Sequence, residues 1–252
     1  MSESQSHGLL RKVASSSASV ISGAKFLSPI RMAMWSALTS ALATKHMTIG
    51  PANNEEERKP VYDLIRRIRL ETEMVLLDQE AYNIYSGVRS TEKIPGAIAE
   101  VGVFRGGSAK LIAEAKRGRA LHLFDTFEGL PGVDASGDPL FSRGQFDSSE
   151  DAVRRYLQGY PDVFIYKGIF PATAGPITGS RFSFVHLDVD IYESTAKSLE
   201  FFYPRMSRGA MLISHDYMWA EGVKRAFTEF FADKPEPILE LSGSQCAFVK
   251  IG

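Results

Sequence analysis

The stretch Glu100-Val-Gly-Val-Phe-Arg-Gly-Gly-Ser108 decides the fold of this chain. An apolar run at 97–101 predicts a β-strand, and residues 108–116 have the pattern of a helix. A strand, a glycine-rich turn and a helix in this order bring backbone N–H groups and a helix N-terminus close to a ligand. The alternative is a tight turn whose glycines serve packing and bind nothing.

The glycines of this stretch fall at 102, 106 and 107, which does not match the dinucleotide fingerprint G-x-G-x-x-G. The strand instead ends with an acid, Glu100. A carboxylate suits a ligand with an ammonium group or ribose hydroxyls better than a ligand with a pyrophosphate. S-adenosylmethionine (SAM) carries the ammonium and the ribose and has no phosphate, so the residues indicate a SAM site.

Length and charge set the broad class of the protein. The chain has 252 residues, enough for one large α/β domain with an additional segment. Its net charge of −1 argues against nucleic acid as a partner, because no basic excess is present to neutralise phosphates. A single cysteine, Cys246, excludes an intrachain disulfide and a cysteine-based metal cluster. We therefore expect a reduced, cytoplasmic protein.

Residues 1–54 differ from the rest of the chain. They contain five Lys or Arg residues and one acid, Glu3, and they are rich in Ser and Ala. The apolar positions of 26–47 have roughly helical spacing, but Pro29 interrupts them and the run is too short for a membrane span. We expect a flexible or helical basic arm at 1–54. A helix on a membrane surface, with weak membrane contact, and an organelle-type leader are the alternatives.

The remaining chain predicts one α/β domain at 55–252, with a helical cap at 55–93 and a core at 94–252. Short apolar strands alternate with helices, which implies a doubly wound, mostly parallel sheet closed by an antiparallel C-terminal strand. Helices are expected at 61–68, 72–85, 108–116, 148–157, 194–202 and 223–231. Strands are expected at 97–101, 120–124, 163–166, 181–187, 210–214, 238–241 and 246–251.

Ionisable residues follow the last apolar residue of several predicted strands. In parallel sheets ligands bind outside the carboxyl ends of the strands, so these side chains should converge on one edge. Asp125 is placed to accept hydrogen bonds from ribose hydroxyls, and Phe127 to pack against an adenine. The residues concerned are Glu100, Asp125, Asp188, His215 and Asp216.

A second group consists of Asp188, Asp190, His215 and Asp216. Carboxylates and an imidazole around an open position suit Mg²⁺, Mn²⁺ or a similar cation. Such a cation would acidify a substrate hydroxyl, and a free carboxylate nearby would take its proton. The alternative for Asp188 and Asp190 is a loop pair that caps the helix starting near Ser194.

Five motifs, in this order along the chain, resemble the macrocin O-methyltransferase (TylF-type) family. The likeness covers roughly residues 60–252. The motifs are Ile94-Pro-Gly followed by the stretch 100–108, Leu123-Phe-Asp-Thr-Phe-Glu-Gly129, Lys167-Gly-Ile-Phe-Pro171, Leu187-Asp-Val-Asp-Ile-Tyr-Glu-Ser194 and Ser214-His-Asp-Tyr217.

The resemblance implies a Rossmann-like, seven-stranded SAM-dependent methyltransferase fold and a metal-assisted transfer to a sugar hydroxyl in natural product biosynthesis. It implies a homodimer, with a small-molecule sugar or glycoside as acceptor. Asp190 falls on the position of the general base, and Asp188, His215 and Asp216 fall on the metal-ligand positions. The implied SAM-binding residues are Met74, Glu100, Val101, Gly102, Ser108, Asp125 and Phe127.

One position departs from the family's pattern. The family usually has two consecutive carboxylates after its fifth strand, and here the first is His215. A neutral histidine is a competent ligand, but it removes a negative charge and shifts preference from Mg²⁺ towards softer cations. The alternatives are a SAM-binding or regulatory protein without catalysis, an NAD(P)-dependent enzyme, and a methyltransferase for phenols. Specificity is expected from the loop at 127–147 and from the N-terminal helices.

Overall fold

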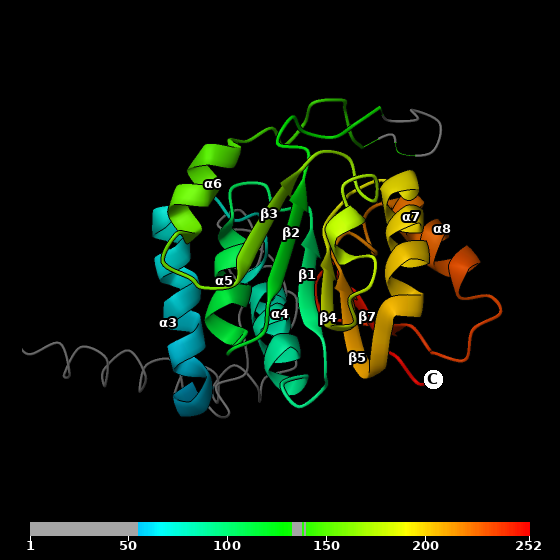
Figure 1. Cartoon of the computed structure of the whole chain (residues 1–252), viewed down its shortest axis with the longest axis horizontal. Coiled ribbons are helices and arrows are strands. Elements are labelled where there is room, and N and C mark those ends of the chain that lie inside the picture. Colours follow the sequence, from blue (N-terminus) through cyan, green and yellow to red (C-terminus); the bar gives the residue numbers. More distant parts are fainter. Residues whose placement is uncertain (1–54, 133–137, 139) are drawn as a thin grey trace, which may run out of the picture. The chain divides into compact units, whose positions relative to one another are not determined.

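The computed structural model of the protein describes residues 55–132, 138 and 140–252 (Figure 1). The arm expected at 1–54 lies outside the described residues. In the part of the chain that is described, no helix has both the length and the apolar character needed to cross a membrane.

The centre of the fold is a seven-stranded sheet with the strand order β3-β2-β1-β4-β5-β7-β6. The first five strands along the chain are parallel, and β7 runs antiparallel to both β5 and β6. This confirms the predicted fold class. The strands are β1 Ala97–Val101, β2 Leu121–Asp125, β3 Val163–Lys167, β4 Phe182–Leu187, β5 Met206–Ser214, β6 Leu239–Glu240 and β7 Cys246–Val249.

Helices cover both faces of the sheet (Figure 1). One face packs against α3, α4, α5 and α6, and the other packs against α7 and α8. The helices are α3 Glu55–Glu71, α4 Asp78–Ser90, α5 Gly107–Ala115, α6 Glu150–Leu157, α7 Tyr192–Phe202 and α8 Glu221–Phe230, with short 3₁₀ turns at Gly175–Ile177 and Tyr203–Arg205.

The alternation of side chains along β1 shows how the two faces are built. Ile98 lies in the core beneath α3–α6, whereas Ala99 and Val101 lie in the core beneath α7 and α8. Both faces of a central strand are therefore apolar, as expected for a parallel sheet covered on both sides.

The predicted helix at 72–85 differs from the structure. Helix α3 ends at Glu71, residues 72–77 are not helical, and α4 begins at Asp78. The side chain of Arg69 donates hydrogen bonds to the backbone carbonyls of Met74, at 2.8 Å, and Leu76. These bonds satisfy carbonyls that a helix would otherwise pair, which explains why the helical pattern is interrupted.

The predicted fifth strand is also longer than expected, since β5 begins at Met206 and not at 210. The start of β5 was not recognised in the sequence because Ser207 and Arg208 are polar. A register shift between Phe182 and Phe184 lets β4 pair with the longer strand. The other strands lie within one or two residues of their predicted positions. The carboxyl ends of β1, β2, β4 and β5 thus meet at one edge of the sheet.

Candidate active site

A cavity lies at this edge of the sheet. Its wall comes from the 72–77 segment, the turn between β1 and α5, the loop after β2, residues 168–170, and the residues that follow β4 and β5. The predicted site residues that line it are Met74, Val101, Gly102, Ser108, Asp125, Asp188, Asp190, His215 and Asp216.

The turn after β1 approaches the end of β4 closely. Gly102 has a φ of +88°, and a β-carbon built there would lie 1.8 Å from the carbonyl oxygen of Asp188. Gly106, with a φ of +81°, precedes the first residue of α5 in a left-handed conformation. Glycine is the residue that tolerates both conditions. The glycines therefore bring the first turn of α5, with Gly107 and Ser108, to the cavity wall.

Asp125 holds this turn through backbone hydrogen bonds. Its Oδ2 accepts from the N–H groups of Val103, at 2.7 Å, and Phe104, at 2.8 Å, and its Oδ1 accepts from Phe127 N–H at 2.7 Å. Burial raises the pKa of Asp125, while these three donors oppose the rise. A carboxylate has further acceptor lone pairs, so binding a ligand hydroxyl is compatible with its role in the turn.

Two predicted cofactor residues, Glu100 and Phe127, do not line the cavity among the described residues. Glu100 shares the face of Ile98 and is fully buried, with its Oε1 2.8 Å from Nδ1 of His186 on β4. Burial raises the pKa of Glu100. Phe127 packs into the core beneath α3–α6, and its backbone N–H reaches Asp125. Both side chains thus point into the core and not into the cavity.

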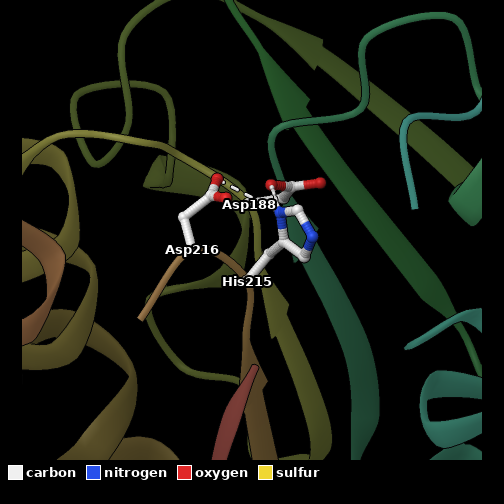
Figure 2. A group of neighbouring side chains, drawn as sticks. All are labelled: Asp188, His215 and Asp216. Carbon is white, nitrogen blue, oxygen red and sulfur yellow. Dashed lines mark ion pairs between the residues drawn. The ribbon is translucent and has the colours of Figure 1, made fainter. Parts of the chain in front are cut away.

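The predicted metal ligands meet in space, as Figure 2 shows. Nδ1 of His215 lies 3.1 Å from Oδ1 of Asp188 and 3.1 Å from Oδ2 of Asp216. Although burial disfavours the charged imidazole, the neighbouring carboxylates raise the pKa of His215 well above its ordinary value. Burial also opposes the charge of Asp188, but His215 lowers the pKa of that carboxyl.

Asp190, the predicted base, lies beside this cluster and is buried. Burial, followed by the negative charges of Asp188 and Asp216, raises the pKa of Asp190 well above its ordinary value. Asp190 and Asp216 have φ values of +62° and +61°, in the left-handed region that aspartate adopts infrequently. Backbone strain of this kind concentrates at functional sites.

The donor set fits a divalent cation. One ligand atom each from Asp188, His215 and Asp216 can be chosen so that all lie within 4.8 Å of one another. Two carboxylates and one imidazole suit Mn²⁺, Co²⁺ or Zn²⁺ at least as well as Mg²⁺.

Sequence reasoning missed one residue of this site, Glu80 of α4. Its Oε2 lies 3.3 Å from Nε2 of His215, although 135 positions separate the two residues. Burial opposes the charge of Glu80, yet hydrogen bonds from His215, Ser244 and Leu77 lower the pKa of that carboxyl. The position of Glu80 in the first turn of α4 could have suggested a helix-capping role, but no pattern links it to His215.

The chain is similar to known O-methyltransferases. A family described as Macrocin-O-methyltransferase (TylF) matches residues 69–248. Demethyldecarbamoylnovobiocin O-methyltransferase of Streptomyces niveus is 32% identical over 155 residues, which cover 55% of this chain and 59% of that protein. The 8-demethyl-8-(2,3-dimethoxy-alpha-L-rhamnosyl)-tetracenomycin-C 4'-O-methyltransferase of Streptomyces olivaceus is 31% identical over 140 residues, covering 49% of this chain and 54% of that protein.

A solved structure, that of the O-methyltransferase NovP, superimposes with a TM-score of 0.64 at 26% identity and covers 71% of this chain and 82% of that one. The chain spans between half and three fifths of the length of the two curated relatives above. The family match itself extends from the end of α3 to β7. The chain belongs to the macrocin O-methyltransferase family.

Proposed function

We propose that the protein is a SAM-dependent O-methyltransferase that transfers a methyl group to a hydroxyl of a sugar or glycosylated natural product. The observation that carries this proposal is that one cavity is lined both by the glycine-rich β1–α5 turn and by the carboxylates of Asp188, Asp190 and Asp216. Methyl transfer requires the methyl donor and the acceptor hydroxyl to bind next to each other. The residues proposed for each of them therefore have to line the same cavity. The family relatives named above are O-methyltransferases, one of them for a rhamnosyl-bearing compound.

The residues proposed to hold SAM surround the first turn of α5. The N–H groups at Gly107 and Ser108 suit the carboxylate of the cofactor, because a helix N-terminus favours negative charge. Asp125 suits the ribose hydroxyls, and Met74 with the rest of the 72–77 segment covers the cofactor from water. Bound SAM supplies an electrophilic methyl group, so the protein has to orient the two reactants.

Glu100 and Phe127 are proposed to support the cofactor site from the core. Ser108, which lines the cavity, lowers the pKa of Glu100 and so interacts with its buried carboxyl group. Phe127 anchors the carboxylate of Asp125 through its backbone N–H. Both residues thus act through a neighbour.

Asp188, His215 and Asp216 are proposed to hold a divalent cation, with Mg²⁺, Mn²⁺ or a softer ion as candidates. Such an ion supplies charge compensation and acidifies an oxygen ligand. Asp190 would accept the proton of the acceptor hydroxyl at a carboxylate oxygen. To do so Asp190 has to be ionised. Burial and the repulsion from Asp188 and Asp216 raise its pKa, and positive charge beside these two carboxylates would offset the repulsion.

The acceptor is proposed to bind against the loop after β2 and the 168–170 segment. This part of the wall is mainly apolar, which suits the aglycone of a glycoside. Its described residues are Leu130, Pro131, Phe141, Gln145, Phe146, Gly168, Ile169 and Phe170. Homodimer formation, weak membrane contact through the arm at 1–54 and a cytoplasmic location stay predictions from the sequence.

Calorimetric titration of SAM into metal-stripped protein tests the proposal, repeated with Mg²⁺ and with Mn²⁺. The same samples are then incubated with acceptor glycosides and analysed by mass spectrometry for a gain of one methyl group. We expect SAM to bind, and a methylated glycoside to form in a cation-dependent manner. Absence of SAM binding would contradict the proposal, and SAM binding without transfer to any hydroxyl would favour the non-catalytic alternative.

A further inference from the structure

His215 contacts carboxylates on both sides of its ring. Nδ1 faces Asp188 and Asp216, whereas Nε2 faces Glu80, with its Oε2 at 3.3 Å. The two aspartates that contact His215 follow strands β4 and β5, but Glu80 comes from α4, and it is 2% exposed.

The carboxylate of Glu80 is held in place by other donors. Its Oε2 also accepts from Leu77 N–H at 2.7 Å. Its Oε1 accepts from the N–H of Ser244 at 2.7 Å and from the hydroxyl of Ser244 at 3.0 Å. Gly243 leaves room for this contact, because a β-carbon there would lie 2.3 Å from the same oxygen. The loop before β7 and the first turn of α4 thus position Glu80 for His215.

An ionised carboxylate can only accept hydrogen bonds, so Nε2 of His215 has to be the donor in its contact with Glu80. A neutral imidazole with its proton on Nε2 has its lone pair on Nδ1, the atom that faces Asp188 and Asp216. A carboxylate behind a metal-binding histidine orients the ring and selects the ligand nitrogen in this way.

We propose that Glu80 is a positioning residue that keeps a proton on Nε2 of His215 and so makes Nδ1 the nitrogen ligand of the cation site. This inference rests on the cation-binding part of the proposed function and is independent of methyl transfer. A carboxylate at position 215 would need no hydrogen-bond acceptor behind it. This chain has a histidine there, and Glu80 of α4 supplies the acceptor that orients the ring. A nitrogen ligand also favours Mn²⁺, Co²⁺ and Zn²⁺ over Mg²⁺.

The test measures Mn²⁺ binding to the full 252-residue chain through the electron paramagnetic resonance signal of free Mn²⁺, in the wild type, Glu80→Gln, His215→Asn and the double variant. A glutamine whose amide nitrogen faces Nε2 replaces the acceptor with a donor, so the proton of His215 moves to Nδ1. In the opposite orientation the amide nitrogen faces the N–H of Ser244 and loses the bond that holds the side chain in place. We expect Glu80→Gln to weaken Mn²⁺ binding about 10- to 100-fold. In the His215→Asn background the same substitution should cost about threefold or less, because no ring remains to be positioned.

This double-mutant cycle separates the effect of orienting the His215 ring from the effect of the negative charge of Glu80. Loss of one negative charge weakens cation binding in both backgrounds alike, so an equal loss in both would overturn the proposal. Glu236→Gln is the matched control, because Glu236 is another buried glutamate whose partners Tyr203, Lys250 and Ile251 do not line the cavity. It should leave Mn²⁺ affinity unchanged, and a loss equal to that of Glu80→Gln would also overturn the proposal.

A second measurement does not depend on a variant that folds. Long-range ¹H–¹⁵N spectra of the Zn²⁺-loaded wild type should show His215 with a proton on Nε2 and the metal on Nδ1. Coordination through Nε2, or a wild type that binds neither Mn²⁺ nor Zn²⁺, would overturn the inference. SAM affinity of the same samples tests the cofactor part of the proposed function separately, since SAM binding without cation binding would refute this inference and the proposed cation site but leave the SAM site standing.

Discussion

Gly102 and Asp188 meet so closely that a β-carbon on the glycine would lie 1.8 Å from the carbonyl oxygen of the aspartate. The two residues directly follow the neighbouring strands β1 and β4, and Asp188 N–H also donates to the carbonyl of Val101 at 2.9 Å. The turn proposed to hold SAM and the strand end proposed to hold the cation therefore share one backbone contact. A change at this contact should affect both halves of the site.

Gly102→Ala should destabilise the protein by about 3–5 kcal/mol, because it adds a steric clash to an unfavourable φ of +88°. SAM binding and cation binding should both be lost. Gly144→Ala is the control, since Gly144 also has a positive φ, +80°, but no atom within 4 Å of its β-carbon position. It should cost about 1–2 kcal/mol. Urea denaturation measures both, and equal costs would show that the contact with Asp188 is unimportant.

Asp190→Asn should lower the rate of methyl transfer at least about 100-fold, because the amide cannot accept the proton. SAM affinity should stay within about threefold, since the substitution leaves the β1–α5 turn intact. Because Asp188 and Asp216 repel a charged Asp190, the variant should be no less stable than the wild type. Steady-state kinetics, calorimetry and a melting curve provide the three readouts. Retention of most of the turnover would refute the assignment of Asp190 as the base.

Asp125→Asn should weaken SAM binding by about 1–3 kcal/mol. The amide has one acceptor oxygen, but the N–H groups of Val103, Phe104 and Phe127 donate to both oxygens of the carboxylate. The turn should open for this reason, even apart from any lost ribose contact. Calorimetry with SAM checks the expectation. An unchanged affinity would mean that Asp125 neither binds the cofactor nor shapes its site.

The ionised carboxylate of Glu236 should stabilise the fold, and this part of the unfolding free energy should be lost in acid. Although burial opposes its charge, hydrogen bonds from Tyr203, Lys250 and the N–H of Ile251 lower the pKa of Glu236 from 4.5 to about 2. A folded-state pKa below the unfolded value stabilises the fold above pH 4.5, and this contribution is lost as the pH falls from 4.5 to about 2. The difference in unfolding free energy between wild type and Glu236→Gln should shrink by about 3 kcal/mol over this range. A constant difference would contradict the pKa shift.

The order of helices and strands followed from local patterns. Short apolar runs bounded by glycine, proline and acidic residues predicted β1 to β4 within one or two residues. The start of β5 was missed because Ser207 and Arg208 are polar, and the break before α4 was missed because residues 72–77 continue the helical composition. The carbonyls of Met74 and Leu76 are satisfied by Arg69, and such long side-chain contacts are not visible in a periodic pattern.

The candidate cluster was also predictable in outline. Asp188, His215 and Asp216 each follow a parallel strand, and parallel strands bring their carboxyl ends to one edge of the sheet. The same rule placed Glu100 at that edge, and the structure has it near the carboxyl end of β1 but outside the cavity lining. A strand residue points to one face or the other, and the face of Glu100 is covered by helices.

The sequence by itself therefore determined the sheet, its helices and the acidic strand ends, because these depend on residue type and spacing along a few neighbouring positions. Only the tertiary structure decided which side chains reach the cavity. It turned Glu100 towards His186, bonded Asp125 to the β1–α5 turn, and brought Glu80 of α4 to His215. These contacts join residues up to 135 positions apart, and their geometry is set by how the layers pack, which no local pattern of residues encodes.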